Sequence, residues 1–88
     1  MSEQDFSNGI NLKIDQSATY CIRVSGYLDG SWSARLGGLD IHPSGREEKQ
    51  AVTTLSGPLI DQAALMGVLK ALYDMHLPLL SVECVEVT

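Results

Sequence analysis

The sequence predicts an α+β fold, in which an antiparallel-rich sheet of four or five strands carries one full C-terminal helix and one short helix in a βαββαβ-like order. Three observations support this prediction. Residues 62–76 are amphipathic with the helical period, residues 20–28 alternate apolar and polar side chains as a half-buried strand does, and an apolar run follows Pro78. A chain of 88 residues is the size of one domain.

The N-terminal residues divide into a tail and a first candidate strand. Residues 1–9 are polar and end in an Asn-Gly pair, so we expect a flexible tail there and a single domain over residues 10–88. Residues 10–15 alternate apolar and polar side chains, which predicts a strand that could form a hairpin with residues 20–28. An extended arm without a partner is the alternative, so the number of strands stays open between four and five.

A strand and then a short helix are predicted between residues 20 and 38. Gly26 lies inside the strand pattern and indicates a bulge or the close approach of another segment to the backbone. Residues 29–38 predict one or two helical turns, with Asp29 or Ser31 as the N-terminal cap. A pair of glycines at residues 37 and 38 ends that helix.

Two short strands occupy the middle of the chain. Residues 39–42 predict a strand that Pro43 stops, and a polar loop follows it. Residues 50–56 contain β-branched side chains and predict the next strand. The Gly57-Pro58 pair then predicts a turn into the long helix.

The long helix is predicted from about Gln62 to His76. Asp61 is placed to cap its first turn, Ile60 and Leu65 occupy the hydrophobic-staple positions, and Pro78 prevents the helix from continuing. One apolar stripe is expected to face the core, and the opposite face carries small and charged side chains. The stripe is Leu65, Val68, Leu69 and Leu72, and the opposite face is Ala63, Gly67, Lys70, Ala71 and Asp74.

Residues 79–87 predict the last strand, in which the alternation of apolar side chains changes phase near Cys84. That change indicates either a bulge or a strand covered on both faces. The same phase counting groups Cys84 with Leu80 and Val82, and Cys21 with Arg23 and Tyr27. If these groups lie on opposite faces of the sheet, a disulfide cannot form, and we expect two unpaired thiols. The cysteine usage favours a reducing, cytoplasmic location.

The charge distribution disfavours nucleic acid and anionic membrane surfaces as partners. The formal net charge is −5, and the six Lys and Arg residues are spread along the chain. Phosphate groups and anionic lipids are bound by concentrated positive charge. No stretch of 18 apolar residues is present to span a membrane, and the acidic N-terminus does not have the apolar segment of a signal peptide.

No constellation of residues in the sequence predicts catalysis. The sequence contains no Gly-x-Ser-x-Gly motif, phosphate-binding glycine loop or His-Glu-x-x-His helix. His42 and His76 fall in different elements without a second ligand at helical spacing, so we assign them structural or solvent-exposed roles. We therefore expect a protein that is not an enzyme, with no catalytic residue, cofactor or metal.

The predicted helices are too few for the predicted sheet. One complete helix and about two further turns leave apolar sheet surface, or the edge beside the short helix, uncovered, and small proteins commonly bury such surface against another chain. We therefore expect an interaction module, a homodimer with a protein partner not yet identified. A small-molecule binding or sensing domain, with a pocket near Trp32 and the helix at residues 62–76, is the alternative. The candidate interaction surface is Tyr27, Trp32, Arg35, Ala63, Gly67 and Ala71.

Several motifs resemble a family of small bacterial proteins. Its members share a Gly-x-Leu-Asp-x-x-Trp strand end, a Gly-Pro-x-x-Asp-Gln-Ala-Ala-Leu helix start and a Leu-Pro-Leu-Leu-Ser-Val strand, which here begin at Gly26, Gly57 and Leu77. The resemblance covers residues 19–86 and implies a bacterial, cytoplasmic, single-domain protein without an established activity. Family members often carry His at the position of Met66, so an acid–base or metal-binding role of that His is absent from this chain.

Overall fold

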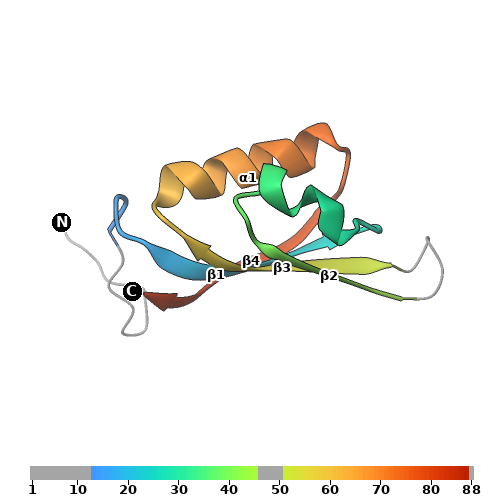
Figure 1. Ribbon diagram of the computed structural model, residues 1–88, viewed down its shortest axis with the longest axis horizontal. Helices are drawn as coiled ribbons and strands as arrows, with labels where there is room; N and C mark the ends of the chain where they lie inside the picture. Colours follow the sequence, from blue (N-terminus) through green and yellow to red (C-terminus); the bar gives the residue numbers. More distant parts are fainter. Residues whose placement is uncertain (1–12, 46–50, 88) are drawn as a thin grey trace.

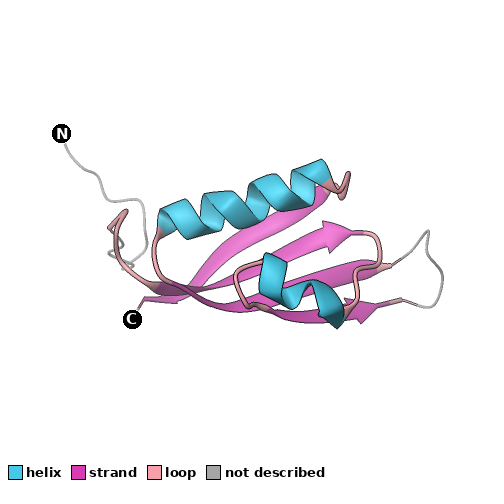
Figure 2. Cartoon of the chain, turned by 45° about the horizontal axis from the view of Figure 1, so that its top comes forward, coloured by secondary structure: helices cyan, strands magenta, loops and turns pink. Residues whose placement is uncertain are grey.

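A computed structural model of the chain shows a four-stranded antiparallel sheet with both helices on one face (Figures 1 and 2). It describes residues 13–45 and 51–87. The predicted α+β class is confirmed. The elements in chain order are β1 (Ala18–Ser25), the 3-10 helix η1 (Gly30–Arg35), β2 (Asp40–Ser44), β3 (Val52–Leu59), α1 (Gln62–Asp74) and β4 (Leu79–Val87).

The strand order β2-β3-β1-β4 places β1 in the interior of the sheet and β4 at its edge. Because β3 and β4 occupy both sides of β1, no position remains beside it for a hairpin with the predicted strand at residues 10–15. Residues 13–15 of that range lie outside the strands, and the N–H of Gln16 donates to the carbonyl of Lys13 at 3.1 Å in a turn. The prediction is wrong for these three residues, and residues 10–12 lie outside the described ranges.

Strand β1 ends at Ser25, earlier than the predicted end at residue 28. The backbone of Gly26 has a φ of 121°, which turns the chain out of the strand, and its N–H donates to the carbonyl of Ala51 at 2.8 Å. A Cβ atom at Gly26 would lie 2.8 Å from a methyl group of Leu77. The close approach that this glycine predicted is therefore confirmed.

Two prolines that were expected to end strands lie inside them. Pro43 is within β2, an edge strand where a missing N–H is tolerated. Pro58 is within β3 and pairs with Thr19 of β1. The pairing between β2 and β3 stops at Asp40 and Ser56, so β3 has no β2 partner at Pro58 that would require its N–H. The predicted turn at Gly57-Pro58 is therefore wrong.

Helix α1 begins and ends through local hydrogen bonds. The carboxylate of Asp61 accepts from the N–H of Ala64 at 2.8 Å, which confirms the predicted cap. The helix ends two residues before the predicted His76, because His76 has a left-handed φ of 64° and the N–H of Leu77 donates to the carbonyl of Leu72 at 3.1 Å. Ile60 is 74% exposed, so the predicted staple with Leu65 does not form.

The core lies between the sheet and the helices. Leu65, Val68 and Leu72 of α1 are buried and Leu69 is half-buried, as the helix phase predicted. They pack in one cluster with the inward side chains of β1 and β3 and with the segments around η1. The core residues outside α1 are Ala18, Tyr20, Ile22, Val24, Leu28, Leu36, Leu39, Leu55 and Leu59.

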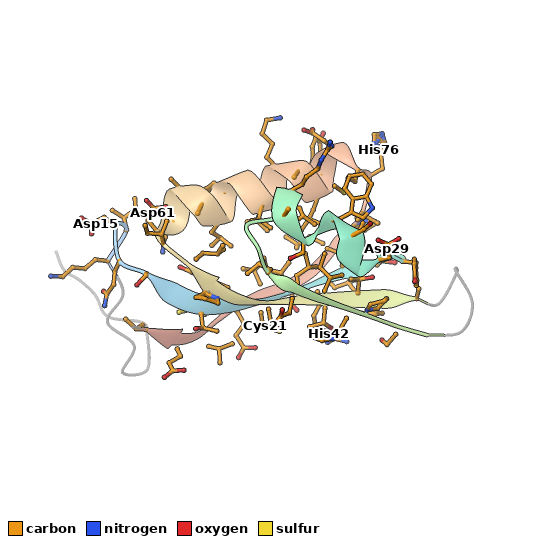
Figure 3. All side chains as sticks on the ribbon, viewed as in Figure 1. Asp15, Cys21, Asp29, His42, Asp61 and His76 are labelled. Carbon is orange, nitrogen blue, oxygen red and sulfur yellow. The ribbon has the colours of Figure 1, made fainter. Side chains whose placement is uncertain are left out.

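The two faces of the sheet differ in chemistry. Cys84 pairs with the inward-facing Tyr20, whereas Cys21 pairs with Glu83 on the outer face, and both thiols are free. Figure 3 shows Cys21 and His42 on the side of the sheet away from the helices. The pairing of β4 with β1 shifts register between Thr19 and Tyr20, next to Cys84, so the predicted bulge is confirmed.

Two substitutions in α1 test the orientation of the helix. Leu72 is 2% exposed, so Leu72→Ala should lower the free energy of unfolding by about 2–5 kcal/mol. A Cβ atom at Gly67 would meet nothing, so Gly67→Ala should raise it by about 1 kcal/mol. Urea denaturation measures both values, and equal stabilities of the two variants would contradict the observed helix phase.

Candidate functional site

The sheet is not fully covered at β4, the strand beside the long helix. Leu79 is 52% exposed and Val82 39% exposed, although both occupy inward-facing positions opposite Val24 and Ile22. The short helix η1 lies over β2 at the other side of the sheet (Figure 2). The uncovered surface expected from the sequence is therefore present, but at the edge beside the long helix rather than the short one.

One flank of α1 continues this apolar surface. Met66 is 57% exposed, Tyr73 is 79% exposed, and Leu69 lies half-buried between them at spacings of three and four residues. This spacing places the three side chains on one side of the helix, along the border of the stripe that packs in the core, to which Leu69 itself belongs. We call Met66, Leu69, Tyr73, Leu79 and Val82 together the α1–β4 surface.

The α1–β4 surface is hollowed where the helix meets the strand. An apolar cavity of about 190 Å³ lies between α1 and the start of β4. Its walls are Leu69, Leu72, Tyr73, Leu77, Pro78 and Leu79. The link between the two elements is held in place because the carbonyl of Pro78 accepts from the N–H of Ser25 at 2.8 Å.

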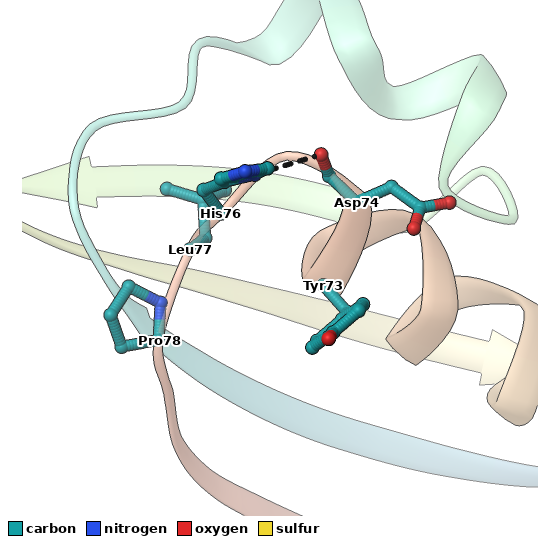
Figure 4. A pocket seen from close by; sticks show the side chains of 5 residues that line it. All are labelled: Tyr73, Asp74, His76, Leu77 and Pro78. Atoms are coloured by element: carbon teal, nitrogen blue, oxygen red, sulfur yellow. Dashed lines mark hydrogen bonds between the residues drawn. The ribbon is translucent and has the colours of Figure 1, made fainter.

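A second, more open pocket of about 430 Å³ lies at the C-terminal end of α1 (Figure 4). Tyr73, Asp74, His76, Leu77 and Pro78 line it, and Nδ1 of His76 lies 3.2 Å from the carbonyl oxygen of Asp74. These residues come from α1 and its link to β4. Trp32 is not among them, so this pocket differs from the one predicted beside Trp32.

The η1 region presents a separate group of side chains. The guanidinium of Arg35 lies 5.7 Å from the centre of the half-buried Trp32 ring, a distance that permits a cation–π contact. Tyr27, in the link before η1, is 58% exposed. Asp29 caps η1 by accepting from the hydroxyl and the N–H of Ser31, which lowers the pKa of its carboxyl group. This cap is present at neutral pH and is lost as the pH falls through that lowered pKa.

The six residues of the predicted interaction surface therefore divide between two elements. Tyr27, Trp32 and Arg35 lie on or beside η1, and Ala63 and Gly67 are exposed on the solvent side of α1. Ala71 packs against the core, and at 100° per residue it lies on the flank of α1 opposite Tyr73. None of the six belongs to the α1–β4 surface. The spacing of Met66, Leu69 and Tyr73 was the sequence signal that could have identified it.

The described ranges contain no group of three or more His, Cys, Asp or Glu side chains that could hold a metal ion. The helices formed by these residues are also too short or too polar to cross a bilayer.

Substitutions at Thr53 test whether this side chain positions the segment that leads into η1. This side chain is fully buried, and its hydroxyl accepts from the N–H of Leu28 at 3.1 Å and donates to the carbonyl of Gly26 at 2.7 Å. Thr53→Val should lower the free energy of unfolding by about 1–3 kcal/mol, because two backbone groups lose their partner. Thr53→Ser keeps the hydroxyl and is the control. Amide exchange at Leu28 should accelerate in the Val variant alone, and protection equal to the wild type would contradict this role.

The comparisons with known proteins place the chain in a family. A family model described as a domain of unknown function, DUF8691, matches residues 19–83, which is more than half of the chain. The searches of curated proteins and of solved structures found no match to the chain. The matched range contains every described helix and strand except the first residue of β1 and the last four of β4. The chain therefore belongs to the DUF8691 family, a family of domains of unknown function.

Proposed function

We propose that this domain is a non-enzymatic protein-interaction module that works as a homodimer, joined through the α1–β4 surface and the outer edge of β4. One observation carries the proposal: an exposed apolar helix flank lies directly beside an apolar edge strand. Each feature alone is common on protein surfaces, but together they offer side-chain contacts and backbone hydrogen bonds to the same partner.

The composition of the two edge strands supports β4 as the pairing edge. β2 has five residues and contains Pro43, which has no N–H to donate. β4 has nine residues without a proline, and its exposed apolar side chains include Leu80 and Val85. Edge strands that avoid pairing are usually short or carry proline or lysine. β2 has such protection. β4 carries two glutamates and two register shifts, but residues 81–84 between the shifts keep regular pairing.

The occupant that we propose is a second copy of the chain. A homodimer repeats one surface on both protomers, so each β4 edge and each helix flank is buried by the equivalent elements of the other. The unpaired thiols of Cys21 and Cys84 support a reducing, cytoplasmic setting for this assembly.

Charged substitutions on α1 test the homodimer. Tyr73→Glu and Met66→Glu each place a charge in the proposed interface, and both should shift the protein to monomer at concentrations where the wild type is dimeric. Both side chains are more than half exposed, so the fold should be retained. Ala63→Glu places the same charge on the solvent side of α1 and should leave the dimer intact. Sedimentation velocity over a concentration series measures this, and a wild type that is monomeric throughout overturns the proposal.

A second candidate function is the binding or sensing of a small molecule in the pocket at the end of α1. Its volume of about 430 Å³ is in the range of ligand sites, roughly 300–1,000 Å³. Titration of the monomeric Met66→Glu variant with phenol and with indole, followed by NMR, tests this function. Saturable shifts confined to residues 73–78 would support it, and the absence of saturable shifts would exclude pocket binding of these aromatic probes.

A further inference from the structure

We infer that the second copy docks in one register, in which the two β4 strands pair antiparallel about a twofold axis at Val82. In this register Arg23 of each protomer reaches the partner's Glu83 across Ser81. The inference rests on the proposed homodimer and names the contacts that select it. Three observations lead to it: the positions of the bulges in β4, the alternation of side chains between the faces of the sheet, and the charges on the outer face.

The bulges limit where β4 can form a regular ladder. Its pairing with β1 shifts register between Arg23 and Val24 and again between Thr19 and Tyr20. Between the two shifts, residues 81–84 pair one to one with residues 20–23. An added strand needs regular backbone spacing, so this stretch is the best template on the edge.

The alternation of side chains requires the twofold axis to lie midway between one residue and its own copy in the partner. Two antiparallel β4 strands in one continuous sheet are related by an axis normal to the sheet, and residues directly opposite each other then point to the same face. If the axis were level with the midpoint between two successive residues of β4, an inward side chain would lie opposite an outward one. Within residues 81–84, an axis at Val82 or at Glu83 gives the longest regular overlap, three residues on each strand.

The charges on the outer face select Val82. An axis at Glu83 would place this carboxylate directly opposite its own copy, and like charges in that position are destabilising. An axis at Val82 places Ser81 opposite the partner's Glu83. Within each protomer, Arg23 of β1 pairs with Ser81 of β4. A row of side chains on the outer face therefore runs across the interface from Arg23 through Ser81 to the partner's Glu83.

The row from Arg23 to the partner's Glu83 suits an ion pair. Their backbones are separated by two strand spacings, about 10 Å, which a long Arg and a Glu side chain can bridge over the small Ser81. Arg23 and Glu83 are both exposed, and within the described part of the chain Arg23 forms no ion pair. The twofold axis forms this contact twice.

The same axis brings the helices together above the sheet. The two copies of α1 run antiparallel on one face, so the flank that carries Met66, Leu69 and Tyr73 in each copy turns toward the partner. The flank of each protomer contains both Met66 and the apolar cavity of about 190 Å³, whose walls include Tyr73 and Leu79. An unbranched methionine side chain adapts well to an irregular apolar cavity.

Charge reversal tests the register directly. Arg23→Glu and Glu83→Arg each create two like-charge contacts, so each variant alone should have a dissociation constant about tenfold higher than the wild type. A mixture of the two variants restores both ion pairs in a heterodimer, which native mass spectrometry separates from the homodimers. The double variant Arg23→Glu/Glu83→Arg should regain dimerisation.

The outcomes separate this inference from the proposed homodimer. A monomeric wild type would overturn both. A dimeric wild type whose single charge variants dimerise equally well, without preference for the mixed dimer, would overturn the register and leave the homodimer standing.

A cross-link gives a second measurement of the register. Val82→Cys places two thiols directly opposite each other, within the separation that a disulfide spans, and should form a covalent dimer under mild oxidation. Glu83→Cys places the two thiols two residues apart along the strands, beyond that separation, and is the matched control. The wild type, which carries Cys21 and Cys84, controls for the native thiols. Equal cross-linking of Val82→Cys and Glu83→Cys would overturn the inference.

Discussion

The pairing of β1 on both of its sides is the constraint on which the rest of the structure depends. Ala18, Tyr20, Ile22 and Val24 of this strand are at most 2% exposed and form the middle of the core. In the strand order β2-β3-β1-β4 of the described residues, β3 pairs onward with β2, whereas β4 lies at the edge of the sheet. Strand β4 therefore has β1 on one side, and the described residues place no strand on its other side.

The helices explain why the edge at β4 is apolar. The buried stripe of α1 packs with the core strands, and η1 lies over β2, so the inward side chains Leu79 and Val82 of β4 stay partly exposed. The described residues, 13–45 and 51–87, form one long helix for four strands. A domain of this size buries a smaller share of its surface than a larger domain does, and part of its apolar surface stays in contact with solvent.

Apolar burial and charge have different roles in the proposed dimer. Burying the exposed half of a leucine or valine side chain contributes roughly 1 kcal/mol, and several such side chains lie on each protomer. An exposed ion pair contributes only about 0.2–1 kcal/mol. The apolar surface therefore supplies most of the affinity. The charges distinguish the register with its axis at Val82 from the one with its axis at Glu83, because the latter places the two Glu83 carboxylates opposite each other.

The sequence by itself determined the features that depend on neighbouring residues: the cap at Asp61, the buried stripe of α1, the bounds of β4 and the change of phase near Cys84. Each follows from local hydrogen bonding or from the period of apolar side chains. Only the tertiary structure decided the strand order, the tolerance of Pro43 and Pro58 within strands, and the exposure of Ile60. It also placed the uncovered surface on the Tyr73 flank of α1 rather than with Trp32 and Gly67. These features depend on which strands become neighbours, and a pairing between segments distant in the chain leaves no periodic signal in either one.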